Sequence, residues 1–194
     1  FNLEKAIANI KLLKEKVNQI VLLLHWGGRV EGGLYPDFDQ PKIAKKLIDA
    51  GVDLIIGHHS HTIQPYEIYK GKYIFYSLGN FCFSDYSFEN KYYEFPKRGK
   101  ETALVNIEFN ELNYTVDINY FKNQIEYYEY DKQYFLWMYF RNFLFHWVLK
   151  IKLMWNLYFF SKKYMLPFIL FLRRKKMSKM EKLVSIYRSF RKYI

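Results

Sequence analysis

Cysteine is almost absent from this sequence, since Cys82 is the only one among 194 residues. An internal disulfide is therefore excluded, and the redox compartment stays open. Long apolar runs are absent too, because cations such as Arg141, Lys150 and Lys152 interrupt the aromatic stretch 134–172. A helix that spans a bilayer needs about 18 or more uncharged apolar residues in a row, so we expect none here.

Acidic residues are nearly absent from the last third of the chain. Residues 132–194 hold 15 Lys and Arg and the single acid Glu181, whereas residues 1–131 hold 15 Lys and Arg and 18 acids. The net charge of +11 is therefore the sum of +14 on residues 132–194 and −3 on residues 1–131. This asymmetry, with 51% hydrophobic residues, predicts a folded domain over 1–131 and a basic, aromatic helical extension over 132–194.

Two short apolar runs, 19–25 and 52–56, each read as a strand and lead into histidine. Residues 39–51 between them read as a helix, for which Asp39 can cap the start and Gly51 can end the last turn. Strand, helix and strand form a βαβ unit, so we expect two parallel strands with a right-handed crossover. The fold class predicted is α/β, with a ligand crevice at the carboxyl ends of the strands.

Histidine gathers at those carboxyl ends. His25 ends the first run, and Gly57-His58-His59-Ser60-His61 follows the second. Neutral imidazole is the commonest protein ligand for zinc and later transition metals. The pattern therefore predicts a metal site of His25, His59 and His61; a polar loop with chance histidines is the alternative.

The other elements follow from simpler patterns. Residues 1–17 read as an amphipathic helix, so we expect that this segment is not a signal peptide. Alternating runs predict two hairpins, 66–69 with 73–78 and 102–109 with 114–121. Residues 85–100 read as a polar, aromatic loop.

Four motifs follow one another along the chain: His25-Trp26-Gly27, Leu47-Ile48-Asp49-Ala50-Gly51-Val52-Asp53, Gly57-His58-His59-Ser60-His61 and Tyr76-Ser77-Leu78-Gly79-Asn80-Phe81. Their order and spacing resemble those of the CapA-like capsule or poly-γ-glutamate synthesis proteins, of the calcineurin-like metallophosphoesterase superfamily. The resemblance covers residues 1–121 and implies part of a metallophosphoesterase-like sheet sandwich flanked by helices. It also implies a metal centre at the strand ends and a role in making or exporting an anionic surface polymer.

The resemblance also implies roles for individual residues. His25, His59 and His61 correspond to metal ligands, and His58 is expected beside the metal, where it could protonate a leaving oxygen. Asn80 is expected to line the same cleft and bind substrate, with a simple turn residue as the alternative. Glu31, Asp37 and Asp39 could orient ligands, although solvated loop or cap roles are favoured for them.

The first half of the family's motifs, including an Asp-containing motif and an Asn-His motif, is missing. Three histidines could hold one divalent transition metal such as Mn, Fe or Zn, but a second ion needs a bridging carboxylate. We therefore expect a carboxyl-terminal fragment or a truncated gene product. Metal-dependent phosphoesterase activity is expected only of a complete site.

The basic extension suits an anionic membrane surface. Mixed aromatic residues and cations favour an interfacial helix, and Arg173-Arg174-Lys175-Lys176 adds a polybasic cluster. A helical cap packed on the domain is the alternative. Three function classes stay open: the CapA-like phosphoesterase acting on an anionic polymer or phosphoester, a noncatalytic membrane-associated assembly subunit, and a nucleic-acid-directed phosphoesterase. No recognisable motif supports nucleic acid.

Overall fold

The structure, a computed structural model, has a mixed α/β fold, which confirms the predicted class. The chain divides into two compact units, residues 1–145 and 146–194. Cys82, Glu31 and Arg173–Lys176 lie outside the described residues. The structure describes residues 2–27, 32–81, 83, 85–94, 97–111, 113–124, 127–130 and 132–165.

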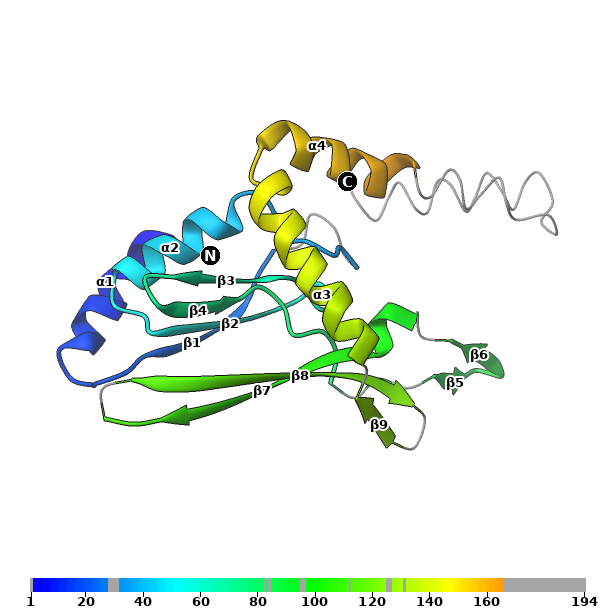
Figure 1. Cartoon of the computed structure of the whole chain (residues 1–194), viewed down its shortest axis with the longest axis horizontal. Helices are drawn as coiled ribbons and strands as arrows, with labels where there is room; N and C mark the ends of the chain where they lie inside the picture. The colour runs from blue at the N-terminus through cyan, green and yellow to red at the C-terminus, as the bar shows by residue number, and fades with distance from the viewer. Residues whose placement is uncertain are drawn as a thin grey trace. The chain divides into compact units, whose positions relative to one another are not determined.

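A four-stranded sheet in the order β1-β2-β4-β3 forms the centre of the first unit (Figure 1). β1 and β2 run parallel, with Val21 opposite Leu54 and His25 opposite His58, as the βαβ pattern predicted. β3 and β4 form the predicted antiparallel hairpin around Lys70-Gly71. The strands are β1 (Val21–His25), β2 (Leu54–His58), β3 (Tyr66–Tyr69) and β4 (Lys72–Phe75).

Two helices lie side by side on this sheet, α1 (Leu3–Lys14) and α2 (Gln40–Asp49). Leu47 and Ile48 of α2 are buried, in agreement with the apolar stripe. Asp39 precedes α2, but its side chain makes no capping hydrogen bond, so that expectation was wrong. The buried Gln40 side chain accepts from the backbone N–H of Asp37 instead (2.7 Å).

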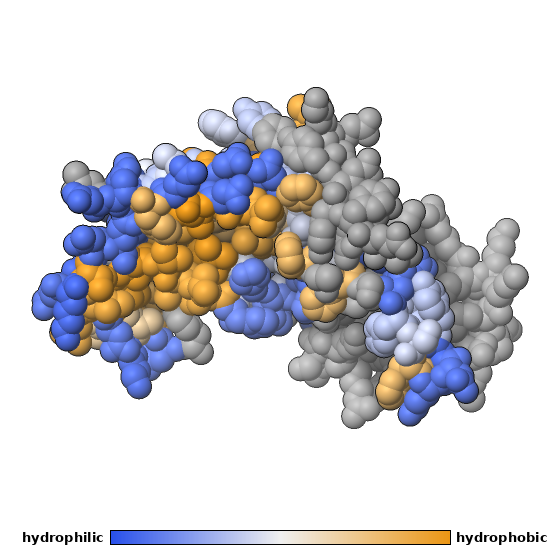
Figure 2. Space-filling model, turned by 90° about the horizontal axis from the view of Figure 1, so that it is seen from below, coloured by the Kyte–Doolittle hydropathy of each residue, from blue (hydrophilic) through white to orange (hydrophobic). Residues whose placement is uncertain are grey.

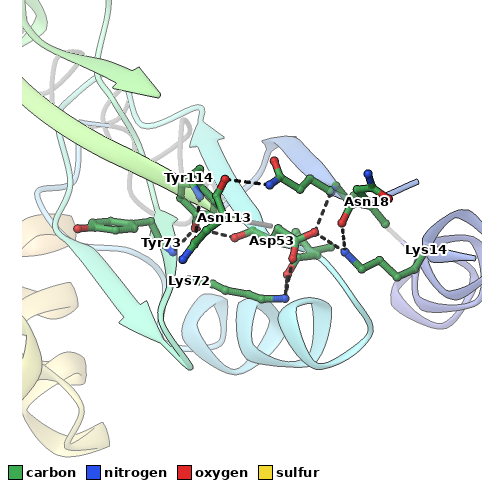
Figure 3. Close-up of polar contacts among 10 residues, drawn as sticks. Lys14, Asn18, Asp53, Lys72, Tyr73, Asn113 and Tyr114 are labelled. Carbon is green, nitrogen blue, oxygen red and sulfur yellow. Dashed lines mark hydrogen bonds and ion pairs between the residues drawn. The ribbon is translucent and has the colours of Figure 1, made fainter. Parts of the chain in front are cut away.

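Asp53 joins several elements at the end of the sheet opposite the histidines (Figure 3). Its carboxylate accepts from the Nζ atoms of Lys14 (2.7 Å) and Lys72 (2.9 Å) and from the backbone N–H of Ile20 (2.9 Å). Its carbonyl accepts from the Tyr114 hydroxyl (2.7 Å). One residue, directly before β2, thus connects α1 and β4 with Tyr114.

A second sheet, β7-β8-β9, packs beneath α3 (Lys132–Leu144). The β7–β8 hairpin was predicted from sequence. Met138 of α3 lies in a buried cluster with Ile63, Ala103 and Tyr120, and α3 belongs to the first compact unit, which ends at Phe145. The division into a domain over 1–131 and an extension over 132–194 stays a prediction. The strands are β7 (Glu101–Phe109), β8 (Tyr114–Gln124) and β9 (Tyr127–Tyr130).

The segment expected to be a loop over 85–100 contains regular structure. It holds an exposed hairpin of β5 (Tyr86–Phe88) and β6 (Lys91–Tyr93), followed by a short 3₁₀ helix (Lys97–Lys100). The prediction failed because each strand is only three residues long, which is too short for an alternating pattern to distinguish it from a loop.

The second unit is helical where it is described, with α4 (Lys152–Phe160) followed by a π-helical turn (Ser161–Met165). None of the described helices is long and apolar enough to cross a bilayer. The metallophosphoesterase sandwich and the interfacial role of the tail stay predictions.

β1 forms one end of the four-stranded sheet and exposes apolar side chains. Val21 is 39% and Leu23 is 69% exposed. Leu104 and Phe109 of β7 are exposed as well. Figure 2 shows a broad apolar area on the face of the molecule seen from below.

Candidate metal site

The candidate site lies at the carboxyl ends of β1, β2 and β4. His25 and His58 are the last residues of β1 and β2 and are paired in the parallel register. His59 and His61 follow in the turn after β2, and Asn80 follows β4. All five residues line one pocket of about 440 Å³, which Phe81, Phe83 and residues 102–105 of β7 complete. The structure therefore gathers the four predicted histidines and Asn80, whereas Asp37 and Asp39 are not among the residues that line the pocket.

His25 and His59 are in direct contact through their ring nitrogens. The Nε2 atom of His25 lies 2.9 Å from the Nδ1 atom of His59, and the rings meet edge to face. The contact needs one unprotonated nitrogen, because two N–H groups cannot bond to each other. Two ligands about 2.1 Å from one metal ion lie about 3.0–3.4 Å apart at tetrahedral or octahedral angles. A metal ion in place of the shared proton would need only a small opening of this pair.

His61 is oriented by Asn80. The Nδ1–H group of His61 donates to the Oδ1 atom of Asn80 (2.8 Å), because an amide oxygen only accepts. Asn80 is buried, and its Nδ2 atom donates to the carbonyl of Gly99 (2.9 Å). In the neutral ring the Nε2 atom of His61 then carries the lone pair. Metal-binding histidines are typically oriented in this way, which favours an orienting role for Asn80 over substrate contact.

The backbone of the histidine turn is strained. His59 has φ 122° and His61 has φ 58°, both in the left-handed region that favours glycine. Such conformations persist where the surrounding structure fixes them, and they cluster at functional sites. No pattern in the sequence indicates this strain.

Gly57 allows close packing directly before the histidines. A Cβ atom there would clash with the carbonyl oxygen of Tyr76 and with the Nε1 atom of Trp26. The Trp26 indole donates to that same carbonyl (3.2 Å) and stacks on the Tyr76 ring. Gly57 and Trp26, quoted in the sequence motifs without a role, therefore set the position of β2 against β4.

His58 favours the neutral form of its imidazole ring. Partial desolvation, with a further contribution from the neighbouring His25, lowers the pKa of the His58 imidazole. The neutral ring is therefore favoured near pH 7. A neutral ring is better suited to accept a proton than to donate one to a leaving group.

Carboxylates are missing from the pocket lining in the described part of the chain. Among those described residues, no group of three or more His, Cys, Asp or Glu side chains is arranged to hold a metal ion. The imidazoles suit a zinc-like ion in chemical type, but the described donors do not form a complete ligand cluster. Metal ligation by His25, His59 and His61 stays a prediction.

Comparison with known proteins agrees with the motif resemblance. Residues 1–85 match the family model of the bacterial capsule synthesis protein PGA_cap. The chain is 42% identical over 77 residues to the PGA biosynthesis protein CapA of Bacillus subtilis, which covers 40% of this chain and 20% of the relative. It is 43% identical over 70 residues to the capsule biosynthesis protein CapA of Bacillus anthracis, covering 36% of this chain and 16% of that relative.

The predicted CapA-like resemblance is thus confirmed over residues 1–85. The chain spans about a fifth or less of the length of these curated relatives. All the candidate site residues, from His25 to Asn80, lie within the matched segment.

Proposed function

We propose that this chain supplies part of a CapA-like protein that acts in the synthesis or export of capsule or poly-γ-glutamate, and that its histidine pocket is a metallophosphoesterase-type metal site. The observation that carries the proposal is the convergence of four histidines and Asn80 on one pocket inside the segment that matches the capsule synthesis family. The sheet sandwich of that superfamily belongs to the same proposal.

The pocket residues have separate tasks in this proposal. His25, His59 and His61 hold a divalent transition metal such as Mn, Fe or Zn, and Asn80 keeps the His61 ring in the ligating tautomer. When bound, the metal supplies a polarised water at neutral pH for attack on a phosphoester or similar anionic group. His58 accepts a proton beside the metal. A second ion requires carboxylates that the described lining lacks.

The second unit supports a peripheral membrane location in this proposal. Residues 146–194 carry 13 Lys and Arg against one acid. In the described part, Trp147, Leu153 and Leu157 are more than half exposed and lie close in sequence to Lys150 and Lys152. Exposed apolar side chains beside cations suit the surface of an anionic bilayer.

A noncatalytic assembly or binding subunit on the same fold is the second candidate. The observation that favours it is the lack of any carboxylate among the described residues that line the pocket. In such a subunit the histidine pocket would bind an anionic group without hydrolysing it.

The test uses three single substitutions in the full chain: His59→Ala, His61→Ala and His58→Ala. We expect the first two to abolish binding of Mn²⁺ or Zn²⁺ in titration calorimetry, because each removes a ligand. His58→Ala should weaken binding by about 10- to 100-fold at most. Equal losses at all three positions would refute the assignment of His58, and no binding by the unsubstituted chain would refute the metal site.

A chimera tests whether the histidine pocket is needed for polymer production. The matched segment of the Bacillus subtilis relative is replaced by that of this chain, and cell-surface polymer is measured. We expect the chimera to keep polymer production and the His59→Ala chimera to lose it. Polymer production that survives the loss of every pocket histidine would contradict a role for the pocket in either candidate.

A further inference from the structure

Arg141 of α3 is a charged side chain in the interior of the first unit, where it is 1% exposed. Burial of a guanidinium is costly unless its donors are satisfied. Its Nη2 atom donates to the carbonyls of Leu34 and Ile63, the latter at 2.7 Å. Its Nη1 atom donates to the sulfur of Met138 (3.1 Å), and the guanidinium lies 5.7 Å from the centre of the Tyr35 ring. The sequence pattern marked Arg141 only as a charge that interrupts an aromatic stretch.

The two carbonyls belong to the two loops that lead away from the site histidines. Leu34 lies in the loop between β1, which ends in His25, and α2. Ile63 lies two residues after His61, in the loop between β2 and β3. One nitrogen of Arg141 therefore holds both loops together from a helix far along the chain.

Direct bonds between the loops complete the same network. The Thr62 hydroxyl donates to the carbonyl of Gly33 (2.7 Å), and the Gln64 amide donates to Gly33 (3.1 Å) and Tyr35 (3.0 Å). Ser60, Thr62 and Gln64 are all buried. The turn that carries His59 and His61 is thus fixed to residues 32–35 on one side.

The strained backbone needs such a restraint. His59 and His61 adopt positive φ values, which are unfavourable for residues other than glycine and relax when the surroundings loosen. Relaxation would carry the His59 ring away from His25 and the His61 ring away from Asn80.

We propose that Arg141 is a positioning residue for the histidine pocket, and that it keeps residues 32–35 and 59–65 together so that His59 reaches His25 and His61 reaches Asn80. The proposal rests on the proposed metal site only for the function that this alignment serves. The alignment of the rings itself can be measured without metal.

The test compares Arg141→Met with the unsubstituted full chain. Histidine ring nitrogens are observed in ¹H–¹⁵N correlation spectra without metal, and Co²⁺ affinity is measured separately. We expect the ring signals of His59 and His61 to shift or broaden, and Co²⁺ to bind at least about tenfold more weakly. Arg141→Lys keeps the charge and a single donor group, and should restore the ring signals in part.

Asn142→Ala is the matched control on the same helix, because it removes a hydrogen bond from the backbone N–H of Tyr66 (3.2 Å) that does not involve the two loops. This control should lower thermal stability without changing the ring signals. A folded Arg141→Met protein with unchanged ring signals would overturn the proposal.

If Arg141→Met fails to fold, Thr62→Val tests the same restraint, since it removes one bond between the loops and keeps the side-chain shape. Unchanged ring signals in that variant would equally overturn the proposal. If the ring signals change as expected while the unsubstituted chain binds no Co²⁺, the metal site fails and the positioning role of Arg141 stands.

Discussion

His61 and Asn80 are joined by a hydrogen bond of 2.8 Å between the Nδ1 and Oδ1 atoms, which fixes the tautomer of the neutral His61 ring. The two residues come from different loops, after β2 and after β4. The side-chain amide of Asn80 cannot rotate by a half turn without losing its second hydrogen bond, to the carbonyl of Gly99. The orientation of one candidate ligand is thus set by a side chain that need not touch the metal.

Substitution of Asn80 measures this orienting effect. We expect Asn80→Ala to weaken Zn²⁺ binding by about 10- to 100-fold, the usual cost of losing a partner behind a metal-binding histidine. Asn119, whose side chain donates to Asp117 (2.7 Å), provides the matched control Asn119→Ala with no expected change. Titration calorimetry of both variants checks the prediction, and equal affinity for the two would contradict it.

Gly57→Ala tests the close approach of β2, β4 and Trp26. The added methyl group would collide with the backbone of β4, so we expect the free energy of unfolding to fall by about 1–3 kcal/mol. Gly71→Asn is the control, because a side chain at Gly71 meets open space and Asn tolerates its positive φ of 76°. Denaturant unfolding of both variants gives the comparison. A Gly57→Ala protein as stable as the control would show that this packing can relax.

Asp53 makes the stability of the first unit depend on pH. Burial alone would raise the pKa of Asp53, but hydrogen bonds from Lys14, Lys72 and the backbone of Ile20 leave it lowered. A carboxylate with a lowered pKa stabilises the fold fully above its unfolded pKa of about 3.9, and the contribution is lost as pH falls through the folded value.

Asp53→Asn should therefore lower the free energy of unfolding by about 1–3 kcal/mol at pH 7 and remove this part of the acid sensitivity. Asp49→Asn, which affects an exposed pair with Lys70, should leave stability nearly unchanged. Unfolding curves from pH 7 down to pH 3 check both. Parallel pH profiles for Asp53→Asn and the unsubstituted protein would contradict the assignment.

Truncation separates the packed part of the chain from the basic part. A protein ending after Phe145 should fold and lose affinity for anionic vesicles, because it lacks 13 of the 30 Lys and Arg. A protein ending at Asp131 should unfold or aggregate, since it also loses the buried side chains of Met138, Arg141 and Phe145. Thermal unfolding and cosedimentation across a salt series measure the two effects. Vesicle binding that persists in the 1–145 protein would place the contact on the first unit.

The central fold and the histidine cluster were predictable from sequence because local patterns encode them. Apolar runs that end in histidine gave β1 and β2, and the chain direction placed their ends at one edge. α3 was harder, because aromatic residues cover its whole circumference and no single apolar stripe distinguishes it from an interfacial helix.

Long-range contacts were not predictable from such patterns. The bonds from Arg141 to Leu34 and Ile63 join residues far apart in sequence, and a lone cation among aromatic residues gives no sign of its partners. The strain at His59 and His61 likewise depends on the loop that packs against them. The sequence does hold one usable sign, which is the position of Arg141 within an aromatic stretch. A charge in such a stretch needs polar partners if the stretch packs into the interior.

The position of β1 at the end of its sheet has a practical consequence for handling the protein. In the described part of the chain β1 pairs on one side only, with β2, and Leu23 is its most exposed apolar side chain. A strand with an open edge and apolar side chains can recruit a strand from a second molecule and seed aggregation. Purified preparations should therefore become turbid as concentration rises, and a lysine in place of Leu23 should delay the onset.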